Sequence, residues 1–481
     1  MTEKKTKLDE DIKKDVAEHN DSEFTFVEGE DPMGVLPVKR KLAYGLGDLG
    51  ANFSWTFIGS FLMYFWTDIL GVTAAFTGTI MLLSRFWDAI NDPLVGSWAD
   101  RTQTKWGKYR PWLIACIPMA FMNVLAFTPF KFGSQTAKDA YAFIMFFILV
   151  FVFTCMNIPY SAMQTVMTLN PNERSSVASW RLTFAYTGMF IINIATLPLV
   201  NLFGGGNEGK GYFFTAILYS FGIMLPLFMI CFFGTKEIVH HKPKKPVRMR
   251  DNIKILKGNT PVWLLAICFL CFGFYNYGRA ATAMYYFTYN VGDKALFPYY
   301  SFFNMGGNLV GSMLMPRFAV RVQNKALIPR YGFIFTGVIL CIMGLVSPTD
   351  RTAIYIIFGL QLLASLGQGV ASSGMHGMVA DSTDFTHYKY GVRAGGFISA
   401  FNTFMQKMGI GLGTASIGWA LGATGYVAGQ AQSASTLNAI NIIFTYLPGV
   451  IAIAAGLSMF AYKIDKETLK GMMKSIGAYK E

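Results

Sequence analysis

The chain has 481 residues, of which 53% are hydrophobic and only 14% are charged, and it contains 43 Phe and 48 Gly. Soluble domains carry about 25% charged residues, so this composition excludes an ordinary soluble protein and indicates a helical protein that crosses a membrane several times. The formal net charge of +13 does not indicate nucleic-acid binding, because the cytoplasmic loops of membrane proteins collect Lys and Arg.

The first 40 residues are polar, with mixed charges and no apolar core of a signal peptide, and they predict a mobile cytoplasmic tail. A membrane-spanning helix needs about 20 mostly apolar residues. Twelve such runs follow the tail, at 42–67, 72–99, 110–130, 141–166, 176–203, 211–234, 261–289, 296–320, 327–347, 351–376, 392–423 and 437–462.

Basic residues gather in alternate links between these runs. The links after runs 2, 6 and 8 are rich in Lys and Arg, whereas those after runs 1 and 11 have none. The positive-inside rule therefore predicts that both termini are cytoplasmic. The six Cys all fall in apolar runs, where small buried residues are expected.

The long basic link after run 6 has six predicted helices on each side. The sequence predicts an all-α membrane protein with twelve transmembrane helices in two six-helix halves, which is the major facilitator fold. The expected parts are a cytoplasmic polar tail (1–40), an N-terminal bundle (41–234), a basic cytoplasmic linker (235–260), a C-terminal bundle (261–462) and a cytoplasmic C-terminal tail (463–481).

A short repeat compares the two halves. The tetrapeptide LVGS occurs at 94–97 in the second run and again at 309–312 in the eighth. In this register Asp88 and Asp92 correspond to Phe303 and Gly307. If the acids bind something, there is one such site, and it belongs to the N-terminal half.

Charged residues inside the second run form one group. Arg85, Asp88, Asn91 and Asp92 are spaced i, i+3, i+6 and i+7, on one helical face. Each ionised group near mid-membrane costs about 2.5–3.5 kcal/mol. A salt bridge between Arg85 and Asp88 leaves Asp92 unpaired. A proton or monovalent cation would neutralise the remaining charge, and carboxylate and amide oxygens suit sodium.

Other predicted helices carry polar side chains that must face a cavity or one another. They are Asp48, Asn52, Thr154, Asn157, Ser161, Arg181, Arg279, Thr403 and Lys407, with Trp55, Tyr64, Tyr160, Tyr275 and Tyr277 as aromatic candidates. A neutral sugar needs such donors, acceptors and aromatic faces, although packing explains any one aromatic residue. Arg279 is expected either to pair with Asp48 or to bind a substrate carboxylate, which would favour a hexuronide.

Several motifs resemble one known family, the glycoside–pentoside–hexuronide:cation symporters. They are KLAYGLGD at 41–48, WDAINDP at 87–93, KWGKYRPW at 105–112, NIPY at 157–160, LFPYY at 296–300 and MVAD at 378–381. The resemblance covers roughly 38–470 and implies roles for particular residues. They are a cation site (Asp88, Asn91, Asp92, Thr154), an arginine at the sugar site (Arg181), polar residues near both sites (Thr403, Lys407) and a cytoplasmic charged cluster (Asp381, Asp384, Arg393).

The chain also departs from this family at the sugar site. Two positions that carry carboxylates in melibiose permease, a member of the family, are here the amides Asn52 and Asn157. A lysine beside the first is here Ala51, and two tryptophans of that pocket correspond to Ser161 and Ser372. An amide lacks the charge that strengthens a hydrogen bond to a hydroxyl. A galactoside is therefore a less suitable substrate than a xyloside.

Charged loop residues predict a gate on the cytoplasmic side. Gly96, Asp100 and Arg101 resemble a loop motif common across the superfamily. Arg174, which follows Glu173 after the fourth run, is expected to belong to the same network. Positive-inside loop charge explains most of the Lys residues, but it does not explain the acidic partners.

The expected function is secondary active symport of a glycoside or pentoside with Na⁺ or H⁺, by alternating access. A hexuronide symporter, a carrier of an amphipathic lipid and a sensor that does not transport are the alternatives. No enzyme activity, cofactor or nucleic-acid partner is expected, and no ATP-binding motif of the P-loop type is present. The expected location is the bacterial inner membrane, with the lipid bilayer as partner and a monomer as the simplest state.

Overall fold

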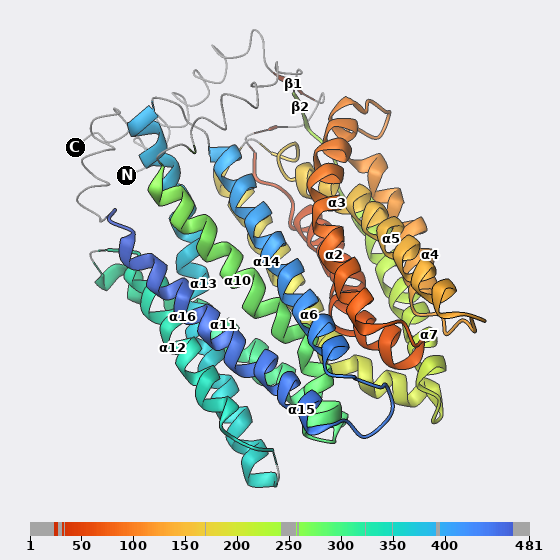
Figure 1. The fold of residues 1–481 in the computed structure, drawn as a ribbon. Helices are drawn as coiled ribbons and strands as arrows, with labels where there is room; N and C mark the ends of the chain where they lie inside the picture. Colours follow the sequence, from red (N-terminus) through yellow and green to blue (C-terminus); the bar gives the residue numbers. More distant parts are fainter. Residues whose placement is uncertain are drawn as a thin grey trace.

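A computed structural model describes most of the chain (Figure 1). The described residues are 24–26, 31–32, 34–168, 170–241, 256, 259–322, 324–348, 350–390 and 395–464. Within them the protein is almost entirely helical, apart from two strands of three residues each.

The first group of helices covers the first half of the chain. Its elements are α2 (Val38–Phe57) continued by the π-helical turns η2 (Ile58–Leu62) and η3 (Phe65–Ile69), α3 (Ala74–Arg101), η4 (Arg110–Ala115) with α4 (Cys116–Ala126), α5 (Gln135–Met163), α6 (Pro171–Gly204), and α7 (Glu208–Ile217), η5 (Leu218–Met224) and α8 (Leu225–Gly234) in succession.

The second group covers the rest. Its elements are α10 (Thr260–Tyr285) with the π-helical turn η6 (Tyr286–Asn290), η7 (Lys294–Leu296), α11 (Phe297–Arg321), α12 (Leu327–Gly344), α13 (Arg351–Tyr390), α14 (Gly395–Ala423), and α15 (Ala434–Asn441), η8 (Ile442–Tyr446), α16 (Leu447–Ser458) and η9 (Met459–Ala461) in succession.

Helix occupies each of the twelve predicted apolar ranges. Among the described residues, seven helices are long and apolar enough to cross a membrane. The predicted all-α membrane protein is therefore confirmed, and the number of twelve crossings stays a prediction.

The helices pack in two groups that follow the sequence (Figure 1). In the first, α2 packs on α6 and α8, and α3 packs on α5. In the second, α10 packs on α14 and α16, and α13 packs on α11 and α12. The groups meet where α3 contacts α14 and where α6 contacts α11. We call these groups the N-terminal and C-terminal halves.

The contact between α3 and α14 follows a seven-residue spacing along α3. A Cβ on Gly418 would lie 2.8 Å from the Cα of Gly78, and a Cβ on Gly411 would lie 2.5 Å from Cγ of Arg85. Only glycine lets the two helices approach this closely. Seven residues beyond Arg85, Asp92 meets Lys407 of α14. This seam joins the two halves along their length.

Part of the predicted mobile tail is bound instead. Strand β1 (Phe24–Phe26) pairs antiparallel with β2 (Val239–His241), which follows α8. Further along, the Leu36 amide donates to the Glu173 carboxylate at 3.0 Å, and Lys41 forms an ion pair with it at 2.7 Å. For these segments the prediction of a mobile tail is wrong, because strand β2 and a carboxylate on α6 supply partners that local composition does not reveal.

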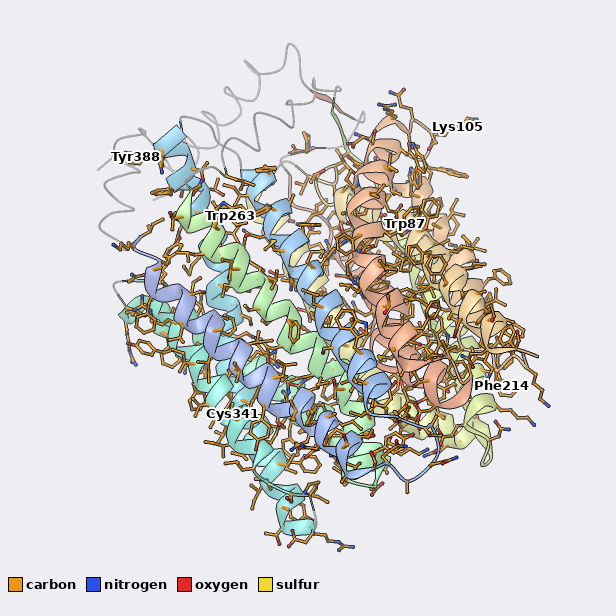
Figure 2. The ribbon with its side chains drawn as sticks, viewed as in Figure 1. Trp87, Lys105, Phe214, Trp263, Cys341 and Tyr388 are labelled. Atoms are coloured by element: carbon orange, nitrogen blue, oxygen red, sulfur yellow. The ribbon has the colours of Figure 1, made fainter. Side chains whose placement is uncertain are left out.

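The two strands define one end of the molecule, at the top of Figure 1, which we call the sheet end. The turns η3 and η6 and residues 424–433 lie at the other end, which we call the opposite end. Figure 2 shows Trp87, the neighbour of Asp88, between Lys105 at the sheet end and Phe214 at the opposite end. The acidic segment of α3 therefore lies between the two ends.

Candidate cation and substrate site

The acidic face of α3 is buried as the sequence predicts. Asp88 is 4% exposed, Asn91 1% and Arg85 8%. Nη1 of Arg85 lies 3.2 Å from Oδ2 of Asp88, so the expected pair forms. The Arg85 guanidinium also lies 5.8 Å from the ring of Trp55 on α2. Because these groups are enclosed, their interactions are strong and their desolvation is costly.

Lys407 completes this charge cluster from the other half. Its Nζ contacts Oδ2 of Asp92 and lies 3.8 Å from Oδ2 of Asp88. The α3 face alone has two carboxylates and one guanidinium, as predicted, but Lys407 cancels the remaining charge. In this conformation a lysine ammonium therefore interacts with the acids that were expected to bind a cation.

Asn91 has an unsatisfied donor beside this cluster. Its Nδ2 has no hydrogen-bond partner among the described residues, although the side chain is almost fully buried. Such a group costs about 1–3 kcal/mol. Thr154, 4% exposed, lies on α5, which packs on α3. Turning the Asn91 amide over would present its oxygen where the nitrogen now lies, and the donor set of carboxylate and amide oxygens fits a small monovalent cation.

A second polar cluster lies within the N-terminal half. Nε of Arg181 donates to Oδ2 of Asp48 at 2.9 Å, and its Nη2 donates to Oγ of Ser161 at 3.0 Å. Asn52 lies one turn after Asp48, donates to the Asp48 carbonyl at 2.8 Å and accepts from the Thr56 hydroxyl at 3.1 Å. The structure therefore brings Asn52 and Arg181 together around Asp48.

Asn157 and Thr403 are partly or fully accessible. Asn157 is half-buried and lies four residues before Ser161 on α5. Thr403 is exposed and lies one turn before Lys407 on α14, where its hydroxyl donates to the Ser399 carbonyl at 2.9 Å. Both side chains are therefore within one helical turn of a member of the two clusters.

Tyr160 has a packing role in this conformation. Its hydroxyl donates to the Tyr44 carbonyl at 2.6 Å, the Tyr44 hydroxyl donates to the Tyr160 carbonyl at 2.9 Å, and the rings stack at 4.7 Å. The side chain is fully buried. The expectation that it contacts substrate directly does not fit this geometry, because the hydroxyl is engaged. Its ring lies 5.3 Å from the Arg181 guanidinium and helps to position it.

Arg279 does not pair with Asp48, and that expected pairing is wrong. Arg279 is 3% exposed, and its Nε and Nη2 each donate at 2.8 Å, to the Phe444 carbonyl and to Oε1 of Gln361. Phe444 lies in the π-helical turn η8. A π-helical turn interrupts the regular helical hydrogen bonds, and the arginine binds a carbonyl in that turn. Arg279 therefore joins three helices inside the C-terminal half.

Two of the expected gate residues at the sheet end, Asp100 and Asp381, pair inside their own halves. Asp100 forms an ion pair with Lys108 at 2.8 Å and accepts from the Tyr109 hydroxyl at 2.8 Å. Asp381 forms an ion pair with Lys325 at 2.8 Å. Arg101 is exposed and Asp384 is half-buried. Arg393 and the side chain of Arg174 lie outside the described residues.

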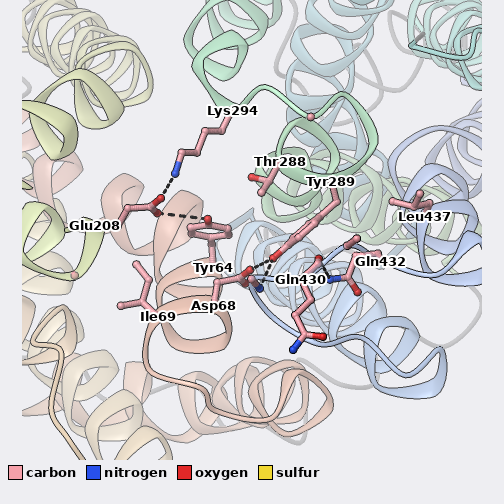
Figure 3. Close-up of a pocket in the computed structure, with 14 residues that line it drawn as sticks. Tyr64, Asp68, Ile69, Glu208, Thr288, Tyr289, Lys294, Gln430, Gln432 and Leu437 are labelled. Carbon is pink, nitrogen blue, oxygen red and sulfur yellow. Dashed lines mark hydrogen bonds and ion pairs between the residues drawn. The ribbon is translucent and has the colours of Figure 1, made fainter. Parts of the chain in front are cut away.

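The opposite end contains a cluster that sequence reasoning missed (Figure 3). The hydroxyls of Tyr289 and Tyr426, both from the C-terminal half, donate to Oδ1 of Asp68. Lys294 of the C-terminal half also forms an ion pair with Glu208 of α7. We call these five residues the latch. Its only sequence signal is an acid at the end of an apolar run, which is too common to be informative.

Two comparisons with known sequences place the chain among transporters. The model of the MFS/sugar transport protein family matches residues 43–466. The isoprimeverose transporter of Lactiplantibacillus pentosus is 33% identical over 441 residues, 90% of each chain. The inner membrane symporter YicJ of Escherichia coli is 32% identical over 92% of this chain and 95% of its own.

Solved structures agree on the fold. The crystal structure of a D-xylose-proton symporter matches with a TM-score of 0.65 over 90% of this chain and 99% of its own, at 10% identity. At this identity the match shows the fold alone. The predicted major facilitator architecture is thereby confirmed.

Proposed function

The chain belongs to the MFS/sugar transport protein family, and we propose that it is a secondary active symporter that takes up a glycoside or pentoside together with Na⁺ or H⁺. The relatives named as an isoprimeverose transporter and an inner membrane symporter support a sugar substrate and a location in the inner membrane. The basic loops support a cytoplasmic sheet end. Alternating access would then rock the N-terminal half (41–234) against the C-terminal half (261–462) around the linker 235–260.

The contact of Lys407 with Asp92 carries the proposal. It joins α14 of one half to α3 of the other inside the bundle. A sodium ion or proton that binds here would compete with the lysine ammonium for the negative charge of the Asp92 carboxylate. Cation binding at Asp88, Asn91, Asp92 and Thr154 would therefore change a link between the halves, which is the physical requirement for coupling.

The proposed sugar contacts are Asn52, Asn157, Arg181, Thr403 and Lys407. Arg181 already binds the Asp48 carboxylate. The carboxylate of a hexuronide would have to compete with Asp48 for this arginine, whereas a neutral sugar can bond the exposed part of the pair without breaking it. The amides at Asn52 and Asn157 favour a xyloside over a galactoside. Asp100, Arg101, Arg174, Asp381, Asp384 and Arg393 are proposed to close the sheet end in the other conformation.

Uptake into proteoliposomes tests the proposal. Isoprimeverose accumulation is measured under an inward sodium gradient at equal pH and, separately, under an inward proton gradient without sodium. We expect one of the gradients to drive accumulation above the external concentration. Asp92→Asn should lose this accumulation. Asp139→Asn should keep it, because Asp139 lies near the start of α5 and bonds only Gln135 among the described residues.

Two results would contradict the proposal. Isoprimeverose uptake that only equilibrates under both gradients would argue against symport of this sugar. Stronger competition by a phenyl glucuronide than by a phenyl xyloside would instead identify a hexuronide carrier.

A further inference from the structure

A cavity of about 770 Å³ opens at the opposite end, away from the cation and substrate site (Figure 3). Both halves line it, with Tyr64, Asp68 and Glu208 on one side and Tyr289, Lys294 and Gln430 on the other. Small-molecule sites usually have volumes of about 300–1,000 Å³. The cavity therefore has room for a mono- or disaccharide, and nothing in the proposed transport site uses it.

The Asp68 carboxylate in this cavity is held by hydroxyl groups. Thr67 donates to Oδ2 at 2.6 Å, and Tyr289 and Tyr426 both donate to Oδ1. Among the described residues, no Lys or Arg lies within ion-pair distance of it. An ionised carboxylate accepts such bonds strongly, and hydroxyls are also the donors that a sugar offers in pairs.

The remaining lining suits the same class of ligand. Tyr64 and Tyr289 provide aromatic rings, and Gln430 and Gln432 provide amides. The partly exposed ion pair adds a charged acceptor, the Glu208 carboxylate, and a charged donor, the Lys294 ammonium. Aromatic faces beside carboxylates and amides are what a neutral polyhydroxyl compound requires. Gln430 is exposed, so the cavity reaches the surface.

We propose that this cavity is a vestibule site for a neutral polyhydroxyl solute, in which hydroxyls of the solute replace the phenols of Tyr289 and Tyr426 at Asp68. The proposal rests on the proposed sugar transport, because the solute is then the transported sugar. Exchange of one hydroxyl for another changes little in hydrogen-bond energy. It does, however, separate the N-terminal half from two residues of the C-terminal half.

Solute binding and opening of the opposite end are therefore coupled. The solute forms these bonds only when the two tyrosines have left Asp68, so it has a higher affinity for the state in which this end is open. Binding must displace existing bonds, so we expect a weak site, with a Kd in the millimolar range. The turns η3 and η6, which contain Asp68 and Tyr289, are π-helical, and such turns are frequent at functional sites.

A binding measurement tests the site directly. The full chain in lipid nanodiscs carries Arg181→Ala to disable the central site, and isoprimeverose binding is followed by saturation-transfer NMR. We expect residual millimolar binding that Asp68→Ala weakens at least tenfold and that Asp139→Asn leaves unchanged. Asn157→Ala, at another proposed sugar contact, serves as a second background if Arg181→Ala does not fold.

A distance measurement tests the coupling. Spin labels replace the exposed residues Lys210 of α7 and Val427, in a variant without the native cysteines. Isoprimeverose should increase the population with a longer distance in the Arg181→Ala background, but not with Asp68→Ala added. Tyr289→Phe with Tyr426→Phe should lengthen the distance without sugar and keep the binding.

The outcomes separate this proposal from the transport function. If wild type transports isoprimeverose but the disabled variants show no binding that depends on Asp68, the vestibule site is refuted and the symporter stands. Retained binding after Asp68→Ala, or binding without a distance change, also refutes it. If wild type neither binds nor transports isoprimeverose or D-xylose, both proposals fail.

Discussion

The two ends of the molecule use their charged residues differently. At the opposite end, Asp68 and Glu208 of the N-terminal half bond Tyr289, Tyr426 and Lys294 of the C-terminal half. At the sheet end, the ion pairs of Asp100 and Asp381 each stay inside one half. The difference shows that polar bonds hold the halves together at the opposite end, whereas the ion pairs of Asp100 and Asp381 at the sheet end do not join the halves.

If the sheet end is cytoplasmic, as proposed, this difference indicates a conformation that is closed toward the outside. With the sheet end in the cytoplasm, the latch closes the outer end, and the gate acids Asp100 and Asp381 at the inner end pair with lysines of their own halves. The reverse conformation would need Asp100 or Asp381 to exchange a local partner for one across the halves, while the latch breaks. Such exchange of partners changes little in total charge pairing, which suits two states of similar free energy.

Removal of the Asp68 carboxylate should have the largest effect on this comparison. Asp68→Ala removes the acceptor of two hydroxyls, and hydrogen bonds to a charged group contribute about 1.5–3 kcal/mol each. We expect the open population at the opposite end to rise at least tenfold, read from the spin-label distance between positions 210 and 427. An unchanged distance would mean that packing, rather than the latch, closes this end.

Removal of the charge on Glu208 should have a smaller effect at the same end. The side chains of Glu208 and Lys294 are 36% and 34% exposed, and an exposed ion pair contributes about 0.2–1 kcal/mol. Glu208→Gln should therefore raise the open population by no more than about fivefold. A shift as large as that of Asp68→Ala would show that the ion pair is the main part of the latch.

Removal of the charge on Asp381, at the sheet end, should have the smallest effect on the spin-label distance between positions 210 and 427. Its partner Lys325 lies in the same half, so Asp381→Asn removes no bond between the halves in this conformation. We expect the open population at the opposite end to change by less than about twofold. A larger change in either direction would break the comparison, because it would show that Asp381 already acts across the halves here.

The sequence predicted the helices because each is a long apolar run, and it predicted the Arg85–Asp88 pair because both residues lie on one helical face. The partners of Asp92 and Asp68 could not be predicted in this way. Lys407 lies 315 positions from Asp92, and Tyr426 lies 358 positions from Asp68. Contacts of this kind depend on how whole helices pack, and local periodicity carries no information about them.

Arg279 and Tyr160 show a second limit. A lone arginine inside an apolar run suggests either a carboxylate partner or a ligand, yet Arg279 binds a carbonyl in a π-helical turn. Tyr160 was expected to stack on a sugar because it is an aromatic residue close to polar ones in the sequence, yet its hydroxyl donates to the Tyr44 carbonyl. Backbone acceptors are present everywhere in the sequence, so a pattern of side chains does not reveal which of them becomes available.

The most direct test concerns the competition between a cation and Lys407 at Asp92. The affinity for isoprimeverose is measured in nanodiscs with sodium varied at fixed pH, and with pH varied without sodium. We predict that sodium raises the sugar affinity, that Asp92→Asn removes this effect, and that Thr154→Ala weakens it while sparing any proton effect. Linkage then requires the sugar to raise sodium affinity by the same factor. Dependence on pH alone would identify a proton-only symporter, whereas a sugar affinity that responds to neither ion would contradict the coupling mechanism.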